Sequence, residues 1–261
     1  MECGERSRDR VSRPRYGVTV ALLILRNLGD YAHPLMSEVF PLLARGREAD
    51  VFDRGDGTIL RRYRERDVPA HELRAMEYAR SQGYPAPVVI AVSGQDLVLE
   101  RITGPTMQEV LFDGTENLSD KAAQLAELHH RLHRIAGPDW LPAKGEGDRL
   151  LHLDLHPKNV ILAASGPVVI DWANTARGPA ALDPAVAIAV FVTARANVGE
   201  DERSAIDAFI EAFARHFDAA DIDAAWPLAL ELRGANHNVT NAERAELAAF
   251  RRKPRGRKKD K

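Results

Sequence analysis

The sequence is poor in cysteine, and Cys3 is the single cysteine in 261 residues. One cysteine excludes an internal disulfide framework and a zinc module that is built from several cysteines. Long hydrophobic runs are also lacking, because no apolar stretch approaches the roughly 18 residues of a membrane-spanning helix. An excess of one charge is lacking too: 36 Lys and Arg stand against 38 Asp and Glu, a net charge of −2. This balance excludes a uniformly basic nucleic-acid-binding protein, and together the absences predict a soluble, cytoplasmic protein with no membrane partner.

The chain does contain enough apolar residues for a sizeable core. Apolar residues make up 45% of the sequence and charged residues 28%, a composition that disfavours global disorder. A length of 261 residues suits one large domain or two small ones.

The two ends differ from the middle. Residues 1–17 carry five arginines, and the apolar stretch Val18–Leu25 that follows is eight residues long. This pattern resembles a signal peptide, but no small-residue cleavage site follows, which disfavours secretion. Met36 opens a segment that reads like a start, so residues 1–39 are predicted to be an extension that is disordered or not part of the native start.

The last segment, 251–261, contains eight Lys or Arg and one Asp. Such charge runs are usually solvated, so we expect a basic, disordered tail. A contact with nucleic acid or another acidic surface is the alternative. Apart from this tail, nucleic acid is not an expected partner.

Residues 40–101 have the pattern of a small sheet with one helix. Gly55-Asp56-Gly57 is a turn signal between two strand candidates. Apolar residues recur at helical spacing from Pro69 to Gln82, and Gly83 favours the end of that helix. The strand candidates are Ala49–Phe52, Thr58–Tyr63, Val88–Val92 and Leu97–Ile102.

After residue 102 the pattern becomes mostly helical. A helix capped by Ser119 or Asp120 is expected to run through Ile135, and Asp183-Pro184 predicts the N-cap and first turn of another. A strand-rich first part and a helix-rich second part predict two lobes with a cleft between them. A further helix has one apolar face, formed by Ile206, Phe209, Ile210, Phe213 and Phe217.

The strongest chemical signal is a polar segment that contains Asp154, Asn159 and Asp171. Two short strand candidates within 159–170, with a turn at 165–167, would form a hairpin that brings Asn159 and Asp171 together at its opposite ends. Two oxygen ligands there suit a hard cation such as Mg²⁺, which also binds phosphate oxygens. Asp154, on the preceding loop, would be free to orient or deprotonate a hydroxyl. These are the parts of a phosphoryl-transfer site.

This segment resembles the catalytic and metal-binding loops of the aminoglycoside phosphotransferase family, which has a protein-kinase-like fold. The resemblance is carried by His-x-Asp-x-x-x-x-Asn from His152 to Asn159, two short strands, and Ile-Asp-Trp around Asp171. It extends from about Leu43 to Asp183, with weaker support through Phe250.

The resemblance implies an α+β, bilobal, protein-kinase-like fold. A small β-rich N-lobe would span residues 40–101 and bind nucleotide, and a larger helical C-lobe would span residues 102–250. By the same resemblance Asp154 is the catalytic base, and Asn159 and Asp171 hold Mg²⁺.

Two features of the N-lobe resemble those of the family, but each differs from the family pattern in its residues. Ala44-x-Gly46-x-x-Ala49-x-Val51 looks like a degraded glycine-rich loop, whose amides would cover the phosphates while Val51 covers the base. Where the family has a phosphate-binding lysine this chain has arginine, assigned to Arg61, which can bind phosphate bidentately but with different geometry.

Two further N-lobe assignments follow. Glu72 shares a helix face with Met76 and Ala79, so it is expected to point inward and pair with Arg61. The segment Leu99 to Ile102 resembles the hinge between lobes, whose backbone would bind the adenine of ATP or the guanine of GTP. The nucleotide-binding residues implied by the resemblance are Gly46, Ala49, Val51, Arg61, Glu72, Glu100 and Ile102.

Several histidines and one aspartate have structural interpretations. His129 and His133 are four apart on a helix, but with no third zinc ligand evident we interpret them as packing residues. The resemblance places His133 beneath the catalytic loop and His152 as a brace of that loop. Asp183 is interpreted as a helix N-cap.

Two other functions stay open. His152-x-Asp154-x-His156 with Asp171 could form a metallohydrolase cluster, although that leaves Asn159 unexplained. A catalytically weak, nucleotide-binding regulatory pseudokinase is favoured by the degraded glycine loop and disfavoured by the intact acidic and amide residues.

The predicted function is Mg²⁺-dependent transfer of the γ-phosphoryl group of a nucleoside triphosphate to a hydroxyl of a small molecule. The resemblance leaves the acceptor open among aminoglycoside-like compounds, choline-like alcohols, sugars and amino alcohols. Residues 200–246, which by resemblance wall the acceptor site, hold eleven acidic and four basic residues. This excess suggests a cationic acceptor, with Asp221 and Asp223 as the candidates to face the cleft. The alternative is that these acids face solvent.

Overall fold

The described part of the chain belongs almost entirely to one compact unit. The contacts divide the chain into Met1–Pro41 and Leu42–Lys261. The predicted extension and the basic tail lie outside the described residues. No helix within the described ranges is long and apolar enough to cross a membrane. The computed structural model describes residues 40–46, 48–112, 117–236 and 239–250.

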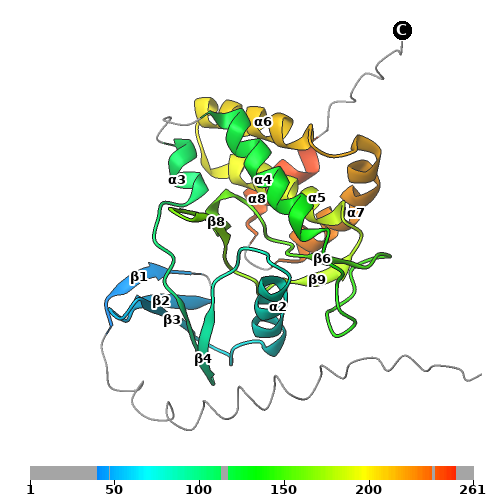
Figure 1. Cartoon of the computed structure of the whole chain (residues 1–261). Helices are drawn as coiled ribbons and strands as arrows, with labels where there is room; N and C mark the ends of the chain where they lie inside the picture. Colours follow the sequence, from blue (N-terminus) through cyan, green and yellow to red (C-terminus); the bar gives the residue numbers. More distant parts are fainter. Residues whose placement is uncertain (1–39, 47, 113–116, 237–238, 251–261) are drawn as a thin grey trace, which may run out of the picture. The chain divides into compact units, whose positions relative to one another are not determined.

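The first part is an antiparallel sheet whose described strands follow the order β1-β2-β3-β5-β4 (Figure 1). β3 has its predicted bounds, and the other three predicted strands are displaced by one or two residues. Gly55 and Gly57 have φ angles of 76° and 81°, a region that favours glycine, which confirms the predicted turn. The strands are β1 (Leu42–Arg45), β2 (Ala49–Asp53), β3 (Thr58–Tyr63), β4 (Val89–Ser93) and β5 (Asp96–Glu100).

The predicted glycine-rich loop is a tight turn between two paired strands. Ala44 lies within β1, a strand that the sequence did not single out, and pairs with Val51 of β2. The Gly46 N–H donates to the Ala49 carbonyl oxygen at 2.9 Å. A Cβ atom at Gly46 would lie 2.7 Å from that oxygen, so the turn requires glycine. The same hydrogen bond means that the Gly46 amide is already engaged within the turn.

Helix α2 (Ala70–Ser81) confirms the predicted helix beside the sheet. Gly83 follows it with a φ of 78°, the left-handed conformation that commonly ends helices. Met76 and Ala79 are buried, and so is Glu72 on the same face. The helical spacing therefore placed the carboxylate of Glu72 inside the protein.

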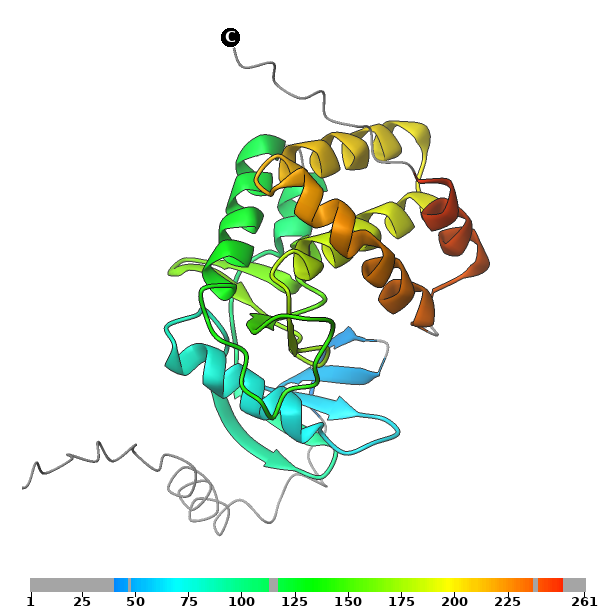
Figure 2. The same cartoon turned by 90° about the vertical axis from the view of Figure 1, so that its right-hand side faces the viewer.

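The second part is mostly helical, as predicted, with α5 at its centre. Nearly every residue of α5 is buried, because a helix that is apolar on all sides needs neighbours on all sides. It packs against α4, α6, α7 and α8, and Figures 1 and 2 show α7 and α8 beside it. The helices are α3 (Met107–Phe112), α4 (Leu118–Leu132), α5 (Leu182–Ala194), α6 (Glu200–Ala214), α7 (Ala219–Ala235) and α8 (Asn241–Ala249).

The predicted apolar face of α6 is the one that packs inward. Phe209, Ile210 and Phe213 are buried. Phe217 lies beyond the end of α6 and places its ring 4.9 Å from that of Phe213. This face joins α6 to α4.

Two predicted helix starts were wrong. The side chain of Asn117 caps α4 by accepting a hydrogen bond from the Ser119 N–H at 2.8 Å, and α4 ends three residues before the predicted Ile135. Helix α5 begins after Ala181, so Asp183 lies inside its first turn rather than at the N-cap. Asp183 does not cap α5 because its carboxylate binds other backbone amides, described below.

Four short strands lie between α4 and α5 in the chain. The hairpin predicted within 159–170 is confirmed as β7 and β8, but its turn is shorter, since β8 begins at Gly166. The pairing of β6 with β9 had no sequence signal. The remaining elements are β6 (Arg149–Leu151), β7 (Val160–Ala163), β8 (Gly166–Val169), β9 (Ala176–Gly178) and the 3₁₀ turns η1 (Pro157–Asn159) and η2 (Arg195–Asn197).

Candidate functional site

Asp154 and Asn159 lie together on the loop between β6 and β7. The Asn159 side-chain amide donates to the Asp154 carbonyl oxygen at 2.9 Å and to its carboxylate Oδ2 at 3.1 Å. The turn η1 brings the two side chains to the same end of the hairpin. Both donated bonds use Nδ2, so the amide oxygen of Asn159 is the atom that can accept a cation.

Asp171 follows the second strand of the same hairpin. Val160 pairs with Val169, and the Ile170 N–H donates to the Asn159 carbonyl oxygen at 3.0 Å. Asn159 and Asp171 therefore flank the open end of one hairpin, as predicted. The Asp171 side chain is 39% exposed, so its carboxylate is accessible.

The backbone of this segment is strained at two points. Among the described residues, Leu153 and Asp171 are the non-glycine residues with positive φ, at 59° and 67°. This conformation is uncommon for residues with a side chain, and most unusual for a residue as bulky as leucine. Strained backbone of this kind persists only where the surrounding structure holds it in place, and it is most common at functional sites. The strain falls beside the predicted base and on a predicted metal ligand.

Arg61 links the sheet to this loop. Its Nη1 lies 2.9 Å from Glu72 Oε1, which confirms the predicted pairing, and its Nη2 lies 2.8 Å from Asp171 Oδ1. The Tyr63 hydroxyl donates to the other oxygen of Glu72. Burial raises the pKa of the Glu72 carboxyl, while the charge of Arg61 and the bond from Tyr63 act against that rise. One guanidinium thus bridges a buried carboxylate and an accessible one.

The strand register places three of the predicted nucleotide-binding residues, Ala49, Val51 and Arg61, on one face of the sheet. Val51 lies opposite Arg61, and Ala49 lies opposite Tyr63, in the pairing of β2 with β3. Directly opposite residues project to the same face. That is the face on which Arg61 reaches Glu72.

The predicted hinge lies where β5 ends. The Glu100 N–H donates to Val88 O at 2.9 Å, and the Glu100 carboxylate accepts from the Val88 N–H at 3.1 Å. The Arg101 N–H donates to Gly57 O at 3.0 Å. Two backbone amides of the hinge are therefore engaged within the sheet, and Ile102 follows them.

His156 lies beside the Asp154 carboxylate and favours its ionised form. Its Nε2 lies 3.4 Å from Asp154 Oδ1. Burial alone would raise the pKa of the Asp154 carboxyl, but the hydrogen bond and charge of His156, with the charges of His152 and Arg233, hold that pKa below its usual value. Asp154 is therefore an ionised acceptor at neutral pH, able to receive a hydrogen bond from a hydroxyl.

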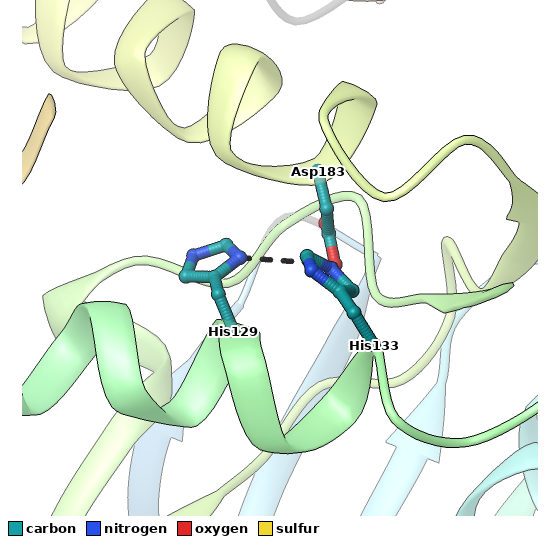
Figure 3. A group of neighbouring side chains, drawn as sticks. All are labelled: His129, His133 and Asp183. Atoms are coloured by element: carbon teal, nitrogen blue, oxygen red, sulfur yellow. Dashed lines mark hydrogen bonds and ion pairs between the residues drawn. The ribbon is translucent and has the colours of Figure 1, made fainter. Parts of the chain in front are cut away.

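Asp183 binds the backbone of the loop that leads to Asp154, and its side chain lies beside those of His129 and His133 (Figure 3). Its Oδ2 accepts from the His152 N–H at 2.9 Å, and its Oδ1 accepts from the Leu153 N–H at 2.7 Å. Its Oδ2 also lies 3.2 Å from His133 Nε2, so His133 does lie beneath the loop. Burial alone would raise the pKa of Asp183, but the His133 hydrogen bond and the nearby histidines lower it. A fully buried charge with these partners fixes the backbone just before Asp154.

His129 and His133 do have a third potential metal ligand beside them, Asp183, which the sequence did not predict. One ligand atom from each of His129, His133 and Asp183 lies within 4.8 Å of the others, and Asp183 was missed because it is 50 residues away in sequence. His129 Nε2 bonds to Leu155 O at 3.2 Å, and burial lowers the pKa of His129 to about 3. The three residues form a buried hydrogen-bonded support for the loop.

His152 has the bracing position that the resemblance implied. It is fully buried, its Nε2 lies 3.2 Å from Ile170 O, and its ring lies 5.0 Å from that of Trp172. The ring therefore connects the loop that carries Asp154 to the segment around Asp171. Among the described residues the ring makes no hydrogen bond or ion pair with Asp154 or Asp171, and the one His/Asp/Glu group placed to share an ion is His129, His133 and Asp183.

A pocket of about 170 Å³ opens beside Asp154. The sequence did not identify its other polar residues, because they come from three distant segments. It is lined by Lys144, Leu153, Asp154, Asn174, Val186, Val190, Leu232, Arg233 and Asn236.

Comparisons with known proteins agree with the resemblance drawn from the sequence. Residues 139–229 match the model of the Phosphotransferase enzyme family (APH), a match that contains Asp154, Asn159 and Asp171. A curated relative from Methanoculleus marisnigri, a "Probable bifunctional tRNA threonylcarbamoyladenosine biosynthesis protein", is 27% identical over 205 residues. The alignment covers 74% of this chain and 35% of the relative, so the chain spans about a third of that protein's length.

Two solved structures show that the fold is kinase-like and bilobal. The gentamicin complex of APH(2")-IIa has a TM-score of 0.55 at 14% identity, over 88% of this chain and 96% of that chain. A type VIII aminoglycoside-3'-phosphotransferase has a TM-score of 0.51 at 16% identity, over 79% and 96%. These likenesses confirm the predicted α+β, protein-kinase-like fold, with an antiparallel sheet in the N-lobe and a helical C-lobe.

Proposed function

We propose that the protein transfers the γ-phosphoryl group of a nucleoside triphosphate, ATP or GTP, to a hydroxyl of a small molecule, with Mg²⁺ as the metal. The observation that carries the proposal is the convergence of Asp154, Asn159 and Asp171 at one hairpin, with Arg61 bound to Asp171 at 2.8 Å. Phosphoryl transfer depends on positioning and on charge neutralisation rather than on covalent chemistry. Two carboxylates, an amide and a guanidinium at one point suit that requirement.

The chemistry of the donor set fits Mg²⁺. The Asn159 amide oxygen and the exposed Asp171 carboxylate are hard oxygen ligands, and Mg²⁺ completes such sites with water and phosphate oxygens. The bound metal would neutralise charge on the phosphates.

Nucleotide binding is assigned to the sheet face and the hinge. Ala49 and Val51 would contact the nucleotide from the face that carries Arg61, whose guanidinium would bind phosphate. At the hinge, the backbone of Ile102 would contact the base, since the Glu100 amide is engaged within the sheet.

Asp154 would receive the acceptor. Its carboxylate would accept the proton of the acceptor hydroxyl while the hydroxyl oxygen bonds to the γ-phosphorus. The bond from that phosphorus to the bridging oxygen of the leaving nucleoside diphosphate breaks in the same transfer. The Asn159 amide and His156 hold the Asp154 side chain in place for this role.

The test is a nucleotide and acceptor screen with a matched variant. ATP and GTP are titrated with and without Mg²⁺ by calorimetry, and transfer to hydroxyl compounds, including sugars, amino alcohols and aminoglycosides, is followed by phosphorus NMR. Asp154→Asn should lower transfer by about 10²–10⁴ and leave nucleotide affinity unchanged. A loss of less than about tenfold contradicts the role of Asp154, and nucleotide binding without transfer to any acceptor would favour the regulatory pseudokinase.

A second candidate function is a nucleotide-dependent step in tRNA modification. It is favoured by the similarity to the Methanoculleus marisnigri protein and by the eight Lys or Arg residues of 251–261. A basic segment binds phosphate backbones in a salt-dependent way. The check is a tRNA-binding assay with the full chain and a chain ending at Phe250 across a salt series. Equal affinity for both chains would remove this candidate and leave the small-molecule kinase standing.

A further inference from the structure

The pocket beside Asp154 has an unexpected charge. Its lining contains one acidic side chain, Asp154, and two basic ones, Lys144 and Arg233. The other polar lining residues are the neutral amides Asn174 and Asn236. None of the lining residues comes from the sheet, so the pocket lies on the acceptor side of Asp154 rather than on the nucleotide side.

The fold holds the guanidinium of Arg233 and the backbone of Lys144. Arg233, on α7, donates from Nη2 to Thr193 Oγ1 on α5 at 2.9 Å, and Thr193 itself is buried. Lys144 precedes β6, and its backbone N–H donates to the Arg177 carbonyl oxygen of β9 at 2.8 Å. None of the ion pairs found among the described residues includes Lys144.

The acidic residues of 200–246, which suggested a cationic acceptor, do not line this pocket. Several have other roles: Asp218 caps α7, Glu202 accepts a hydrogen bond from the Gly199 N–H at the start of α6, Glu243 belongs to a capping box with Thr240, and Glu246 pairs with Arg203. The two acids expected to face the cleft, Asp221 and Asp223, are exposed and are not among the lining residues. The net charge of the segment therefore does not describe the charge next to Asp154.

We propose that the acceptor is a small hydroxyl compound that carries an anionic group, a phosphate or a carboxylate, bound by Lys144 and Arg233 while its hydroxyl lies at Asp154. This inference rests on the proposed phosphotransferase function and names the class of its acceptor. A cationic acceptor would place like charges together in a partly buried pocket, which is unfavourable. An anion gains charge-assisted hydrogen bonds from both side chains.

Pocket size supports a small acceptor. The volume of about 170 Å³ is below the roughly 300–1,000 Å³ of sites for drug-sized ligands. The apolar side chains of Val186, Val190 and Leu232 line the rest of the pocket and would contact the carbon skeleton. A compound of a few carbons, with a hydroxyl at one end and an anion at the other, suits these dimensions.

The experiment compares three small probes of different charge. Glycerol 3-phosphate, glycerol and choline all carry a hydroxyl, and their affinities are measured by calorimetry on the full chain saturated with Mg²⁺ and a non-hydrolysable nucleotide. We expect glycerol 3-phosphate to bind at least about tenfold more tightly than the other two, since hydrogen bonds to charged groups are the stronger ones. Higher salt should weaken this preference.

Variants test the two cations separately. Lys144→Gln and Arg233→Gln should each lower the affinity for glycerol 3-phosphate by about tenfold or more and leave that for glycerol unchanged. Lys144→Arg keeps the charge and should keep the preference. Arg215→Gln, an exposed cation of the C-lobe away from the pocket, is the matched control and should behave like the unmodified chain.

Two results separate this inference from the function on which it rests. Nucleotide affinity is measured before any probe is added, and a chain that binds no Mg²⁺–nucleotide overturns the kinase assignment. If nucleotide binds, but glycerol 3-phosphate does not bind more tightly than both glycerol and choline, the anionic acceptor is overturned alone. It is also overturned if the preference survives in both Lys144→Gln and Arg233→Gln.

Discussion

Replacing Arg61 by methionine removes the charge that joins the sheet to Asp171, at the end of the β7–β8 hairpin. The guanidinium contacts Glu72 Oε1 at 2.9 Å and Asp171 Oδ1 at 2.8 Å. Methionine retains much of the aliphatic bulk, so the change acts mainly on charge and hydrogen bonding. We expect Arg61→Met to destabilise the fold and to weaken Mg²⁺–nucleotide binding at the same time.

The size of the destabilisation follows from burial. The Glu72 side chain has no exposure and that of Arg61 is 14% exposed. Removing one partner of such a buried pair costs about 3–5 kcal/mol, because the other charge is left uncompensated. The Tyr63 hydroxyl still donates to Glu72, so we expect the lower end, about 3 kcal/mol. In a domain of this size that lowers Tm by roughly 6–12 °C.

The neighbouring residue supplies a matched control. Arg62 is next on β3, projects to the opposite face and pairs with Asp96 through Nε at 2.7 Å and Nη2 at 2.8 Å. Its side chain is 39% exposed, so Arg62→Met should cost only about 0–1 kcal/mol. The double variant Arg61→Met/Glu72→Gln should recover much of the lost stability, because no buried charge is then left unpaired. Its nucleotide affinity should stay low.

The assay is urea denaturation of the four chains across pH. In Arg61→Met the folded-state pKa of Glu72 should rise further above its ordinary value, so the folded state binds more protons than the unfolded state. Stability of this variant should therefore fall as pH rises from about 4.5 toward the raised pKa. Equal losses for Arg61→Met and Arg62→Met, or a double variant no more stable than Arg61→Met, would refute the reasoning.

Two further predictions concern the proposed metal ligands and a buried histidine. Asp171→Ala should abolish Mg²⁺-dependent nucleotide binding more completely than Asn159→Ala, because an anionic ligand contributes more to a hard dication than a neutral amide; calorimetry showing the reverse order contradicts this. Burial holds the pKa of His129 at about 3, below its ordinary 6.5. The unfolded chain thus binds a proton that the folded chain does not, so stability should fall as pH drops from about 6.5 toward 3. His129→Gln should flatten that fall in denaturation curves, and an unchanged slope argues against a neutral buried imidazole.

Local sequence patterns predicted the helices and strands, and the pairing of the two strands in the hairpin. Residues at helical spacing placed Glu72 inside, and the hairpin pattern placed Asn159 and Asp171 at one end. Both features depend on short-range geometry, in which the period of a helix or a strand decides where a side chain points. For the same reason the apolar face of α6 was predicted from Phe209 to Phe213.

Long-range contacts were not predictable from these patterns. Asp183 was read as an N-cap because Asp before Pro is a strong cap signal, yet its carboxylate is taken by the backbone amides of His152 and Leu153. Arg233 lies in a helix far along the chain from Asp154, and no periodicity indicates that the two share a pocket. Net charge over 200–246 does not describe the charge of the pocket beside Asp154 for a related reason: it counts acids on every face of three helices.

Because Asp183 lies on α5, the geometry of the loop that leads to Asp154 depends on the folding of the core. The amides of His152 and Leu153 bond to a carboxylate on α5, the most buried helix, rather than to a surface turn. These two amides can exchange their hydrogens with solvent only when that helix separates from the loop, so their protection should approach that of the core itself. The loop that carries Asp154 is then not an independently flexible segment. Substitutions deep among the helices that shift Asp183 should therefore also shift this loop, even when they are far from it in sequence.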